Sequence, residues 1–198
     1  PDYITSLLGL YYLEKEKGRV LVDIRTSRST VEYLRNLGAE VHVWKVGHAF
    51  AKNKLRELGA IFGGELAGHY YFREFFNCDS GILASLLVLH AVKTLKAQDQ
   101  TIGSFIDSIV TWANSGEVNF TLNKKDEAMA ALYERYVTND EPSVVLDFDG
   151  YRVEFTDWWF NVRKSNTEPY LRLVVEAKSQ ELLDEKLAEL GGVITRFS

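Results

Sequence analysis

Hydrophobic residues alternate between helical and strand spacing through the first part of the chain, and this alternation constrains the fold more than any other feature. Apolar positions between Ile4 and Leu13 follow helical spacing, and Gly18 closes that pattern. Residues 19–24 and 39–44 are typical of strands, and Ser27 can cap a helix between them. Helices that alternate with strands in this way predict an α/β layer.

The same alternation continues to a predicted domain boundary. We expect a helix over 48–58, strands over 60–64 and 69–73, a long helix from Asp79 to about Leu95, and another helix over 101–113. The turn-forming residues Asn114-Ser115-Gly116 then end the helical pattern. We therefore predict a mixed-sheet α/β domain over 1–115, joined by a short hinge to a smaller domain over 116–198.

The period changes beyond this boundary. We expect a strand from Glu117 to Leu122, a helix capped by Asn123, strands over 144–146, 151–155, 158–162 and 171–177, and a last helix that opens at Ser179. Strands joined by short loops with few helices indicate an α+β domain, in which an antiparallel sheet carries its helices on one face.

Composition narrows the classes of function. A net charge of −5 with a pI near 5.5 lacks the basic footprint of a nucleic-acid-binding protein. No apolar run approaches the length needed to span a membrane, so no membrane partner is expected. Cys78 is the single cysteine and cannot form an internal disulfide. These features favour a cytoplasmic setting.

One carboxylate stands among three glycines in the run Gly63-Gly64-Glu65-Leu66-Ala67-Gly68-His69, which aromatic residues follow. Glycine lets a backbone approach a ligand closely, and a carboxylate can accept hydrogen bonds from two neighbouring hydroxyls. The run therefore suggests that Glu65 binds a polyol. By itself, however, a Gly-Gly-Glu run is more often a strand end followed by a tight turn.

A second polar run, Arg163-Lys164-Ser165-Asn166-Thr167-Glu168-Pro169, supplies the donors that a phosphate dianion needs. It is expected in a loop between two strands, where its donors can project to solvent. Taken alone it would be an ordinary polar hairpin loop. Together with the glutamate run, it suggests a sugar phosphate as ligand.

Other polar and aromatic residues are explained by ordinary structural roles. Asp147-Phe148-Asp149-Gly150 superficially resembles an acidic metal loop, but it is better explained as a hairpin turn with too few oxygen ligands for a hard cation. Trp158 and Trp159 could form a sugar-stacking platform, yet neighbours on a strand alternate in direction, so one should lie in a core and the other cover it.

Both polar runs resemble the α-D-phosphohexomutase family, the phosphomannomutases and phosphoglucomutases. The family's sugar loop reads Gly-Glu-Met/His/Gln-Ser-Gly-His, and its phosphate loop reads Arg-x-Ser-Asn/Gly-Thr-Glu-Pro. Four further segments resemble the family in the same order: Asp23-Ile24-Arg25-Thr26-Ser27-Arg28, Trp44-Lys45-Val46-Gly47-His48, Asp79-Ser80-Gly81-Ile82 and Gly116-Glu117-Val118-Asn119-Phe120. The resemblance covers nearly the whole chain and implies the third and fourth domains of that family.

The resemblance also implies roles for single residues. Glu65 matches the carboxylate that grips sugar hydroxyls, and Ala67 stands where serine is common, so one hydroxyl contact should be absent. His48 and Arg25 match groups that line the active cleft near the transferring phosphoryl group. Because a guanidinium holds its proton, an acid or base role for Arg25 is not expected. A larger set matches the site of the non-transferring phosphate: Arg163, Ser165, Asn166, Thr167 and, as a weaker candidate, Lys164.

Two motifs of the family do not occur in this sequence, namely the Ser-His-Asn-Pro phosphoserine loop and the Asp-x-Asp-x-Asp-Arg magnesium loop. The resemblance therefore implies the C-terminal half of a mutase that exchanges phosphate between the 1- and 6-positions of a hexose. Pro1 opens the chain without a methionine, as expected for an excised piece. The missing N-terminal domains would supply the nucleophile and Mg²⁺, and this part would bind no metal.

Alternatives remain open at the level of sequence. The sugar could be mannose, glucose or an amino sugar, as in a phosphoglucosamine or phosphoacetylglucosamine mutase. The chain could instead be a noncatalytic sugar-phosphate-binding protein, or a dimerising or regulatory piece with degenerate sites. Oligomeric state is equally open.

Overall fold

Three parallel strands form one side of the first sheet in the computed structural model, which describes residues 1–165 and 168–198. β1 (Arg19–Asp23) pairs with β2 (Glu40–Trp44) on one side and with β3 (Phe62–Gly64) on the other. β4 (Tyr70–Phe72) and β5 (Cys78–Asp79) extend the sheet by antiparallel pairings, in the order β2-β1-β3-β4-β5. The expected mixed-sheet α/β fold is confirmed, but the short β5 is an addition to it.

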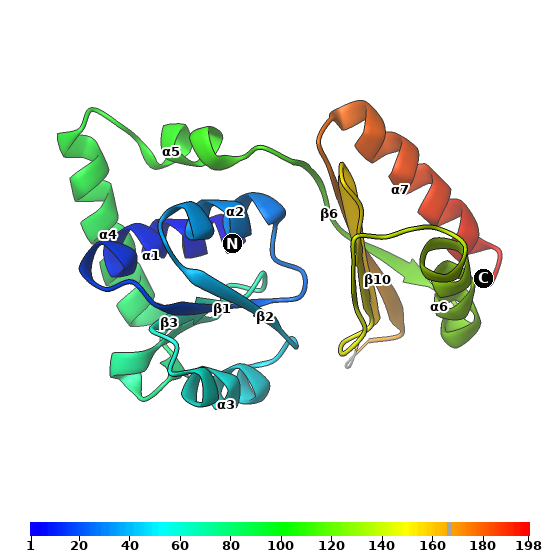
Figure 1. The fold of residues 1–198 in the computed structure, drawn as a ribbon, viewed down its shortest axis with the longest axis horizontal. Coiled ribbons are helices and arrows are strands. Elements are labelled where there is room, and N and C mark those ends of the chain that lie inside the picture. The colour runs from blue at the N-terminus through cyan, green and yellow to red at the C-terminus, as the bar shows by residue number, and fades with distance from the viewer. Residues whose placement is uncertain (166–167) are drawn as a thin grey trace. The chain divides into compact units, whose positions relative to one another are not determined.

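Helices cover both faces of this sheet (Figure 1). They are α1 (Asp2–Lys15), α2 (Arg28–Asn36), α3 (His48–Leu58), α4 (Gly81–Ala97) and α5 (Ile102–Ile109), with a 3₁₀ turn at Arg73–Phe75. Side chains of α1, α2 and α4 form one apolar core with the sheet, whereas Ala51 and Leu55 of α3 pack on its other face.

Serine side chains define where two of these helices begin. Ser27 accepts a hydrogen bond from the Ser29 amide, which confirms it as the cap of α2. The Ser80 hydroxyl accepts from the Leu83 amide, so α4 begins at Gly81 rather than at Asp79, which lies in β5. The predicted helix over 101–113 is too long, because α5 ends at Ile109.

A second sheet contains five antiparallel strands in the order β6-β10-β9-β8-β7. Its strands are β6 (Ala113–Thr121), β7 (Val144–Leu146), β8 (Tyr151–Glu154), β9 (Trp158–Lys164) and β10 (Tyr170–Ala177). α6 (Lys125–Tyr133), continued by a π-helical turn at Glu134–Thr138, and α7 (Gln180–Thr195) share one apolar core with the sheet. Both helices lie on the same face (Figure 1), which confirms the expected α+β arrangement.

Two details of this part differ from the prediction. α6 begins at Lys125 without a side-chain cap, so Asn123 does not cap it. β6 begins at Ala113, and Asn114-Ser115-Gly116 lie inside it at a β-bulge, where the register with β10 shifts. The Ser115 hydroxyl accepts from the Val175 amide at 2.9 Å, and Gly116 has a φ of +67°. The turn-forming residues build a bulge within a paired strand rather than a hinge.

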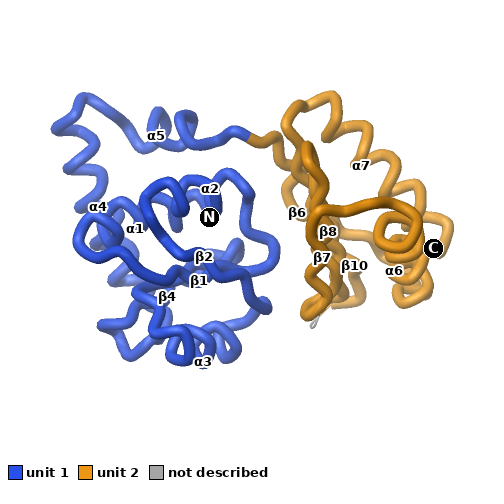
Figure 2. The backbone as a smooth tube through the Cα atoms, in the orientation of Figure 1, with its two compact units in different colours: residues 1–111 blue, residues 112–198 orange. Residues whose placement is uncertain are grey.

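The chain divides into two compact units, residues 1–111 and 112–198 (Figure 2). Each unit holds one of the two sheets. Across residues 1–165 and 168–198, the helices all lack the combination of length and apolar composition that crossing a membrane requires.

Candidate functional site

Three of the predicted site residues follow the carboxyl ends of the three parallel strands. Arg25 comes two residues after β1, His48 follows β2, and Glu65 comes directly after β3. Because β2, β1 and β3 are parallel neighbours, these ends lie along one edge of the sheet. Ligands of α/β sheets bind at this edge, so the topology gathers residues that are far apart in sequence.

The glutamate run forms a tight turn between β3 and β4. The Glu65 amide donates to the carbonyl of His69 at 2.9 Å, and the Gly68 amide donates to the carbonyl of Glu65 at 2.9 Å. Gly68 has a φ of +88°, which favours glycine. Ala67 is exposed at the tip of this turn.

Gly63 and Gly64 serve packing in this structure rather than the approach of a ligand. A Cβ added to Gly64 would lie 2.1 Å from Oγ1 of Thr5, a residue of α1, and one added to Gly63 would lie 2.8 Å from the Leu21 carbonyl oxygen. Their lack of side chains lets α1 and β1 approach β3 closely. The sequence interpretation of these two glycines is therefore corrected.

Glu65 is buried and is held by a tyrosine. Only 3% of it is exposed, and its Oε1 accepts a hydrogen bond from the Tyr71 hydroxyl at 2.7 Å. Burial, strengthened by the neighbouring Glu65 carboxylate, raises the pKa of Tyr71. The hydroxyl therefore keeps its proton and remains a donor, which fixes the Glu65 side chain in one orientation.

Asp23 connects two of the predicted segments. Its Oδ2 accepts from Nη2 of Arg25 at 2.7 Å and from the Leu66 amide at 2.8 Å, while its Oδ1 accepts from the Arg25 amide at 2.7 Å. Both charged side chains are buried. Asp23 thus ties the end of β1 to the turn that carries Glu65. We assigned it no role from sequence, although an acid that ends an otherwise apolar strand is a usable signal.

His48 is the first residue of α3 and is exposed. It follows Gly47, whose φ of +123° turns the chain from β2 into the helix. Lys45, in the same segment, lines a small cavity together with Asp23, Glu65 and Tyr71. That cavity measures about 10 Å³, which is roughly the space of one water molecule.

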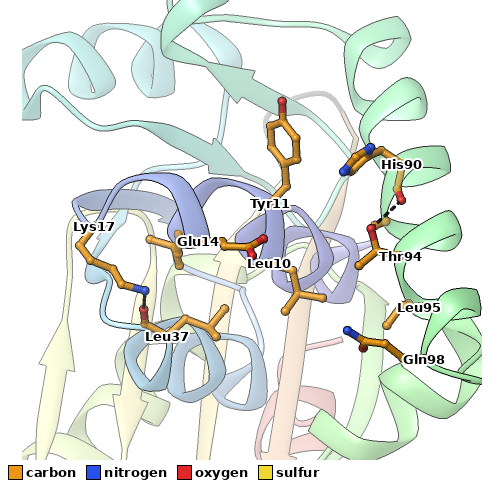
Figure 3. A pocket seen from close by; sticks show the side chains of 11 residues that line it. Leu10, Tyr11, Glu14, Lys17, Leu37, His90, Thr94, Leu95 and Gln98 are labelled. Atoms are coloured by element: carbon orange, nitrogen blue, oxygen red, sulfur yellow. Dashed lines mark hydrogen bonds between the residues drawn. The ribbon is translucent and has the colours of Figure 1, made fainter.

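A larger hollow of about 380 Å³ lies elsewhere in the first unit, between α1 and α4 (Figure 3). Leu10, Leu13 and Leu95 form much of its apolar lining, and Tyr11 meets His90 edge to face at a centroid distance of 5.4 Å. None of the predicted site residues lines it. We therefore do not connect this hollow with the candidate site.

In the second unit, the polar run begins inside a strand rather than in a loop. Arg163 and Lys164 are the last residues of β9. Ser165 follows, and its hydroxyl accepts from the Glu168 amide at 3.2 Å. The exposed Lys164 pairs with Asp126 at 2.7 Å. The two other predicted phosphate-binding residues, Asn166 and Thr167, lie outside the described residues.

Arg163 does not project freely to solvent, which corrects the expectation for this side chain. It is 5% exposed, and its Nη1 lies 4.0 Å from Oδ1 of Asp149. Asp149 belongs to the turn between β7 and β8, as the sequence predicted for that acidic segment. A Cβ on the next residue, Gly150, would lie 2.2 Å from the Val162 carbonyl oxygen, so this turn packs directly against β9.

The two tryptophans point to opposite faces of the second sheet. Trp158 packs in the apolar core with the helices. Trp159 is fully buried, its indole N–H donates to Glu176 at 2.8 Å, and the Arg152 guanidinium lies 3.7 Å from its ring centroid. With both rings buried, this pair offers no exposed surface on which a sugar could stack.

The described residues do not fit a bound divalent cation. Within residues 1–165 and 168–198, His, Cys, Asp and Glu side chains nowhere gather in a group of three that could hold a metal ion. Asp149 of the acidic turn faces a guanidinium instead. A hard cation needs several oxygen ligands at one point, so no metal-dependent step can be derived from these residues.

Comparison with known proteins places both units in one family. The family model "Phosphoglucomutase/phosphomannomutase, alpha/beta/alpha domain III" matches residues 1–111, and "Phosphoglucomutase/phosphomannomutase, C-terminal domain" matches residues 117–190. A phosphomannomutase of Escherichia coli (strain K12) is 40% identical over 185 residues, covering 92% of this chain and 40% of that protein.

Solved structures agree with these matches. The crystal structure of a phosphoglucomutase/phosphomannomutase family protein from Burkholderia thailandensis has a TM-score of 0.81 at 26% identity, covering 99% of this chain and 41% of that one. Aspergillus fumigatus N-acetylphosphoglucosamine mutase, solved in complex with GlcNAc-6P and magnesium, has a TM-score of 0.65 at 13% identity, covering 98% and 43%, which shows the fold alone. The chain spans only 40–42% of the length of the first curated relatives it matches.

Proposed function

Because this chain belongs to the phosphoglucomutase/phosphomannomutase family, we propose that it forms the sugar- and phosphate-recognition part of a longer enzyme that interconverts hexose 1-phosphate and hexose 6-phosphate. The observation that carries the proposal is the position of Glu65. Its buried carboxylate follows β3 at the edge where the parallel strands of the mixed sheet end, and Tyr71 and Asp23 fix the turn that carries it.

Glu65 recognises the sugar in this proposal. Tyr71 engages its Oε1, and Oε2 is the atom that would accept from a sugar hydroxyl. A hexose is much larger than the adjoining 10 Å³ cavity. The sugar must therefore lie over the mouth of the cavity, or the turn from Glu65 to Gly68 must move outward to admit it. Ala67, exposed beside Glu65, would add only an apolar contact.

The phosphate that does not react is held by the second unit in this proposal. Arg163 would supply two parallel N–H donors, and Ser165 and Lys164 would add a hydroxyl and an ammonium group. Asn166 and Thr167 continue the same run and complete the proposed set. Nη1 of Arg163 lies 4.0 Å from Oδ1 of Asp149, so the phosphate would compete with that carboxylate for the guanidinium.

Phosphoryl transfer itself would take place against groups supplied by the remainder of the longer enzyme. In-line transfer depends mainly on positioning and charge neutralisation. His48 and Arg25, at the same sheet edge as Glu65, would stabilise charge near the transferring group, and Asp23 holds Arg25 in place. Mg²⁺ would be bound by the remainder of that enzyme and would supply further neutralisation of charge when present.

The single cysteine, Cys78, supports a cytoplasmic setting.

The proposal is tested with the longer enzyme and with this chain separately. In the longer enzyme, Glu65→Gln should lower kcat/KM by the factor that corresponds to a loss of about 1.5–3 kcal/mol in transition-state stabilisation, the range for hydrogen bonds to charged groups, while the fold is retained. The 198-residue chain alone should not convert glucose 1-phosphate to glucose 6-phosphate in the presence of magnesium and a bisphosphate activator.

Two results would contradict the proposal. One is turnover by the purified chain alone, and the other is an unchanged kcat/KM of the Glu65→Gln enzyme with mannose, glucose and glucosamine phosphates. The kcat/KM values of the same three substrates rank the sugar preference, because the loss of a contact to one specific hydroxyl lowers kcat/KM only for the sugars that make it.

A further inference from the structure

α4 is apolar around most of its circumference. From Gly81 to Val92 it contains no charged residue, and Ser85 and His90 are its only polar side chains. Its core face is already defined, because Ala84, Leu87, Ala91 and Leu95 are buried against the first unit. A helix that is hydrophobic on all sides is normally buried on all sides, whereas a surface helix carries charges on its outer face.

The outer face of α4 is nevertheless open to solvent. Ile82 is 80% exposed, Leu86 59% and Leu89 65%. Their spacing of four and three residues places them in one line, opposite the buried face. We call these three residues the α4 stripe. By contrast, α3, on the other face of the sheet, carries lysine, arginine and glutamate and buries only Ala51 and Leu55.

Two exposed phenylalanines lie between β4 and α4 in the chain. Phe75 is 44% exposed and Phe76 is 76% exposed. Phe76 also has a φ of +58°, a left-handed conformation that is rare for a bulky side chain, and Arg56 donates to its carbonyl oxygen at 3.3 Å. A strained backbone that presents an aromatic ring to water needs an explanation beyond the folding of this unit.

We propose that the α4 stripe, with Phe75 and Phe76, is an interface that packs against the part of the longer enzyme preceding this chain. The inference rests on the proposed function for the identity of that occupant. The relatives extend for more than half of their length beyond the matched region, since the match covers only 40–42% of them. Interfaces between domains of one chain typically bury about 600–1,500 Å², a size to which several large apolar side chains contribute.

Cysteine scanning tests the interface directly, because thiol modification depends on access. With Cys78 replaced by serine, Leu86→Cys is introduced into the 198-residue chain and into the longer enzyme. Its reaction with a soluble aromatic disulfide should be at least about tenfold slower in the longer enzyme. Asn53→Cys, at an exposed position of α3, is the matched control and should react at similar rates in both proteins.

The possible outcomes separate this inference from the proposed function. Equal rates for Leu86→Cys in both proteins would overturn the interface, whatever the activity of the enzyme. Protection in the 198-residue chain itself, with a dimer in sedimentation that Leu86→Glu dissociates, would overturn it in favour of a second copy. Protection confined to the longer protein supports the interface, and if that protein also lacked mutase turnover, only the proposed function would fail.

Discussion

Tyr71 is the residue on which the orientation of Glu65 depends. Its hydroxyl is the donor to Oε1 of a carboxylate that is 3% exposed. Tyr71→Phe would leave that oxygen buried without this donor, which should lower the stability of the first unit by about 1–3 kcal/mol. Native-state hydrogen exchange of the β3 and β4 amides measures the change.

Tyr70→Phe is the matched control for this prediction. The Tyr70 hydroxyl donates to the carbonyl of Pro1, which lies at the exposed start of the chain. Its removal should therefore have a smaller effect. Equal exchange rates in the Tyr71→Phe variant and the unaltered protein would show that Glu65 does not need this donor.

Arg163 provides a second prediction at the scale of single residues. Lysine keeps its charge but loses the two-pronged donor geometry, so Arg163→Lys should weaken binding of mannose 1-phosphate clearly and Arg163→Ala should weaken it more. Amide NMR titration of this chain measures the affinity and locates the shifts. Lys164→Ala should weaken binding less than either change at Arg163, because that side chain is exposed and paired with Asp126.

The location of the shifts decides the outcome. Shifts near residues 163–165 that disappear in the Arg163→Ala variant would support the assignment. Shifts confined to other regions, or an affinity that depends on Lys164 instead, would contradict it.

The sequence singles out some site residues and not others for a physical reason. Glu65 and Arg163 stand in short runs of unusual composition, so local sequence is enough to nominate them. The roles of Asp23 and Asp149 depend on contacts across strands that are paired only in the fold. Asp23 reaches the Leu66 amide 43 positions away, and no local pattern encodes that distance.

At the scale of secondary-structure elements, the packing of α1 on β3 sets the position of the glutamate turn. Gly64→Ala would place a Cβ 2.1 Å from Oγ1 of Thr5, and overpacking of this kind typically costs about 1–3 kcal/mol. Thr5→Ala should recover part of that loss, because it removes the atom that clashes. Chemical denaturation of the single and double variants measures the coupling between the two positions.

Gly192→Ala is the control, for which we expect the opposite change in stability. Gly192 lies within α7, and a Cβ there would meet no atom within 4 Å. Alanine should therefore stabilise the second unit by roughly 0.5–1 kcal/mol through helix propensity. A Gly64→Ala variant as stable as the unaltered protein would show that α1 can shift to admit a side chain.

Sequence patterns predict some element boundaries correctly and miss others. Ser27 and Ser179 are correct as helix caps because capping involves only neighbouring residues. Asn114-Ser115-Gly116 have the composition of a linker, yet pairing with β10 draws them into β6 as a bulge. The two-residue β5 is too short for any periodicity, and its pairing with β4 alone defines it.

At the scale of the whole molecule, the fold classes of both units follow from the sequence because hydrophobic period and sheet type are linked. Alternating helices and strands favour parallel pairing, and successive short strands favour antiparallel pairing. The period does not reveal which outer faces remain uncovered. The α4 stripe emerges only when burial is known, since its residues also continue an ordinary apolar helix.

Buried tyrosines in both units predict how the stability of the molecule depends on pH. Burial raises the pKa of Tyr70 to about 12 and raises the pKa values of Tyr12, Tyr71 and Tyr136 as well, from the ordinary value of 10.0. The folded chain therefore retains protons that the unfolded chain releases near pH 10. This contribution to stability is complete below pH 10 and is lost as the pH rises toward 12, so the Tm should fall steeply over that interval.

Tyr70→Phe should make the fall of Tm with pH shallower. Tyr70 is one of the groups whose pKa is raised by folding, and phenylalanine has no proton to release on unfolding. Thermal unfolding followed by circular dichroism from pH 8 to pH 12 measures the slope. An absorbance titration at 295 nm identifies the groups in the folded protein, where part of the tyrosine signal should stay protonated beyond pH 11. If all ten tyrosines ionised together near pH 10 while the protein was still folded, burial would not control their pKa values and the predicted loss of stability would have no source.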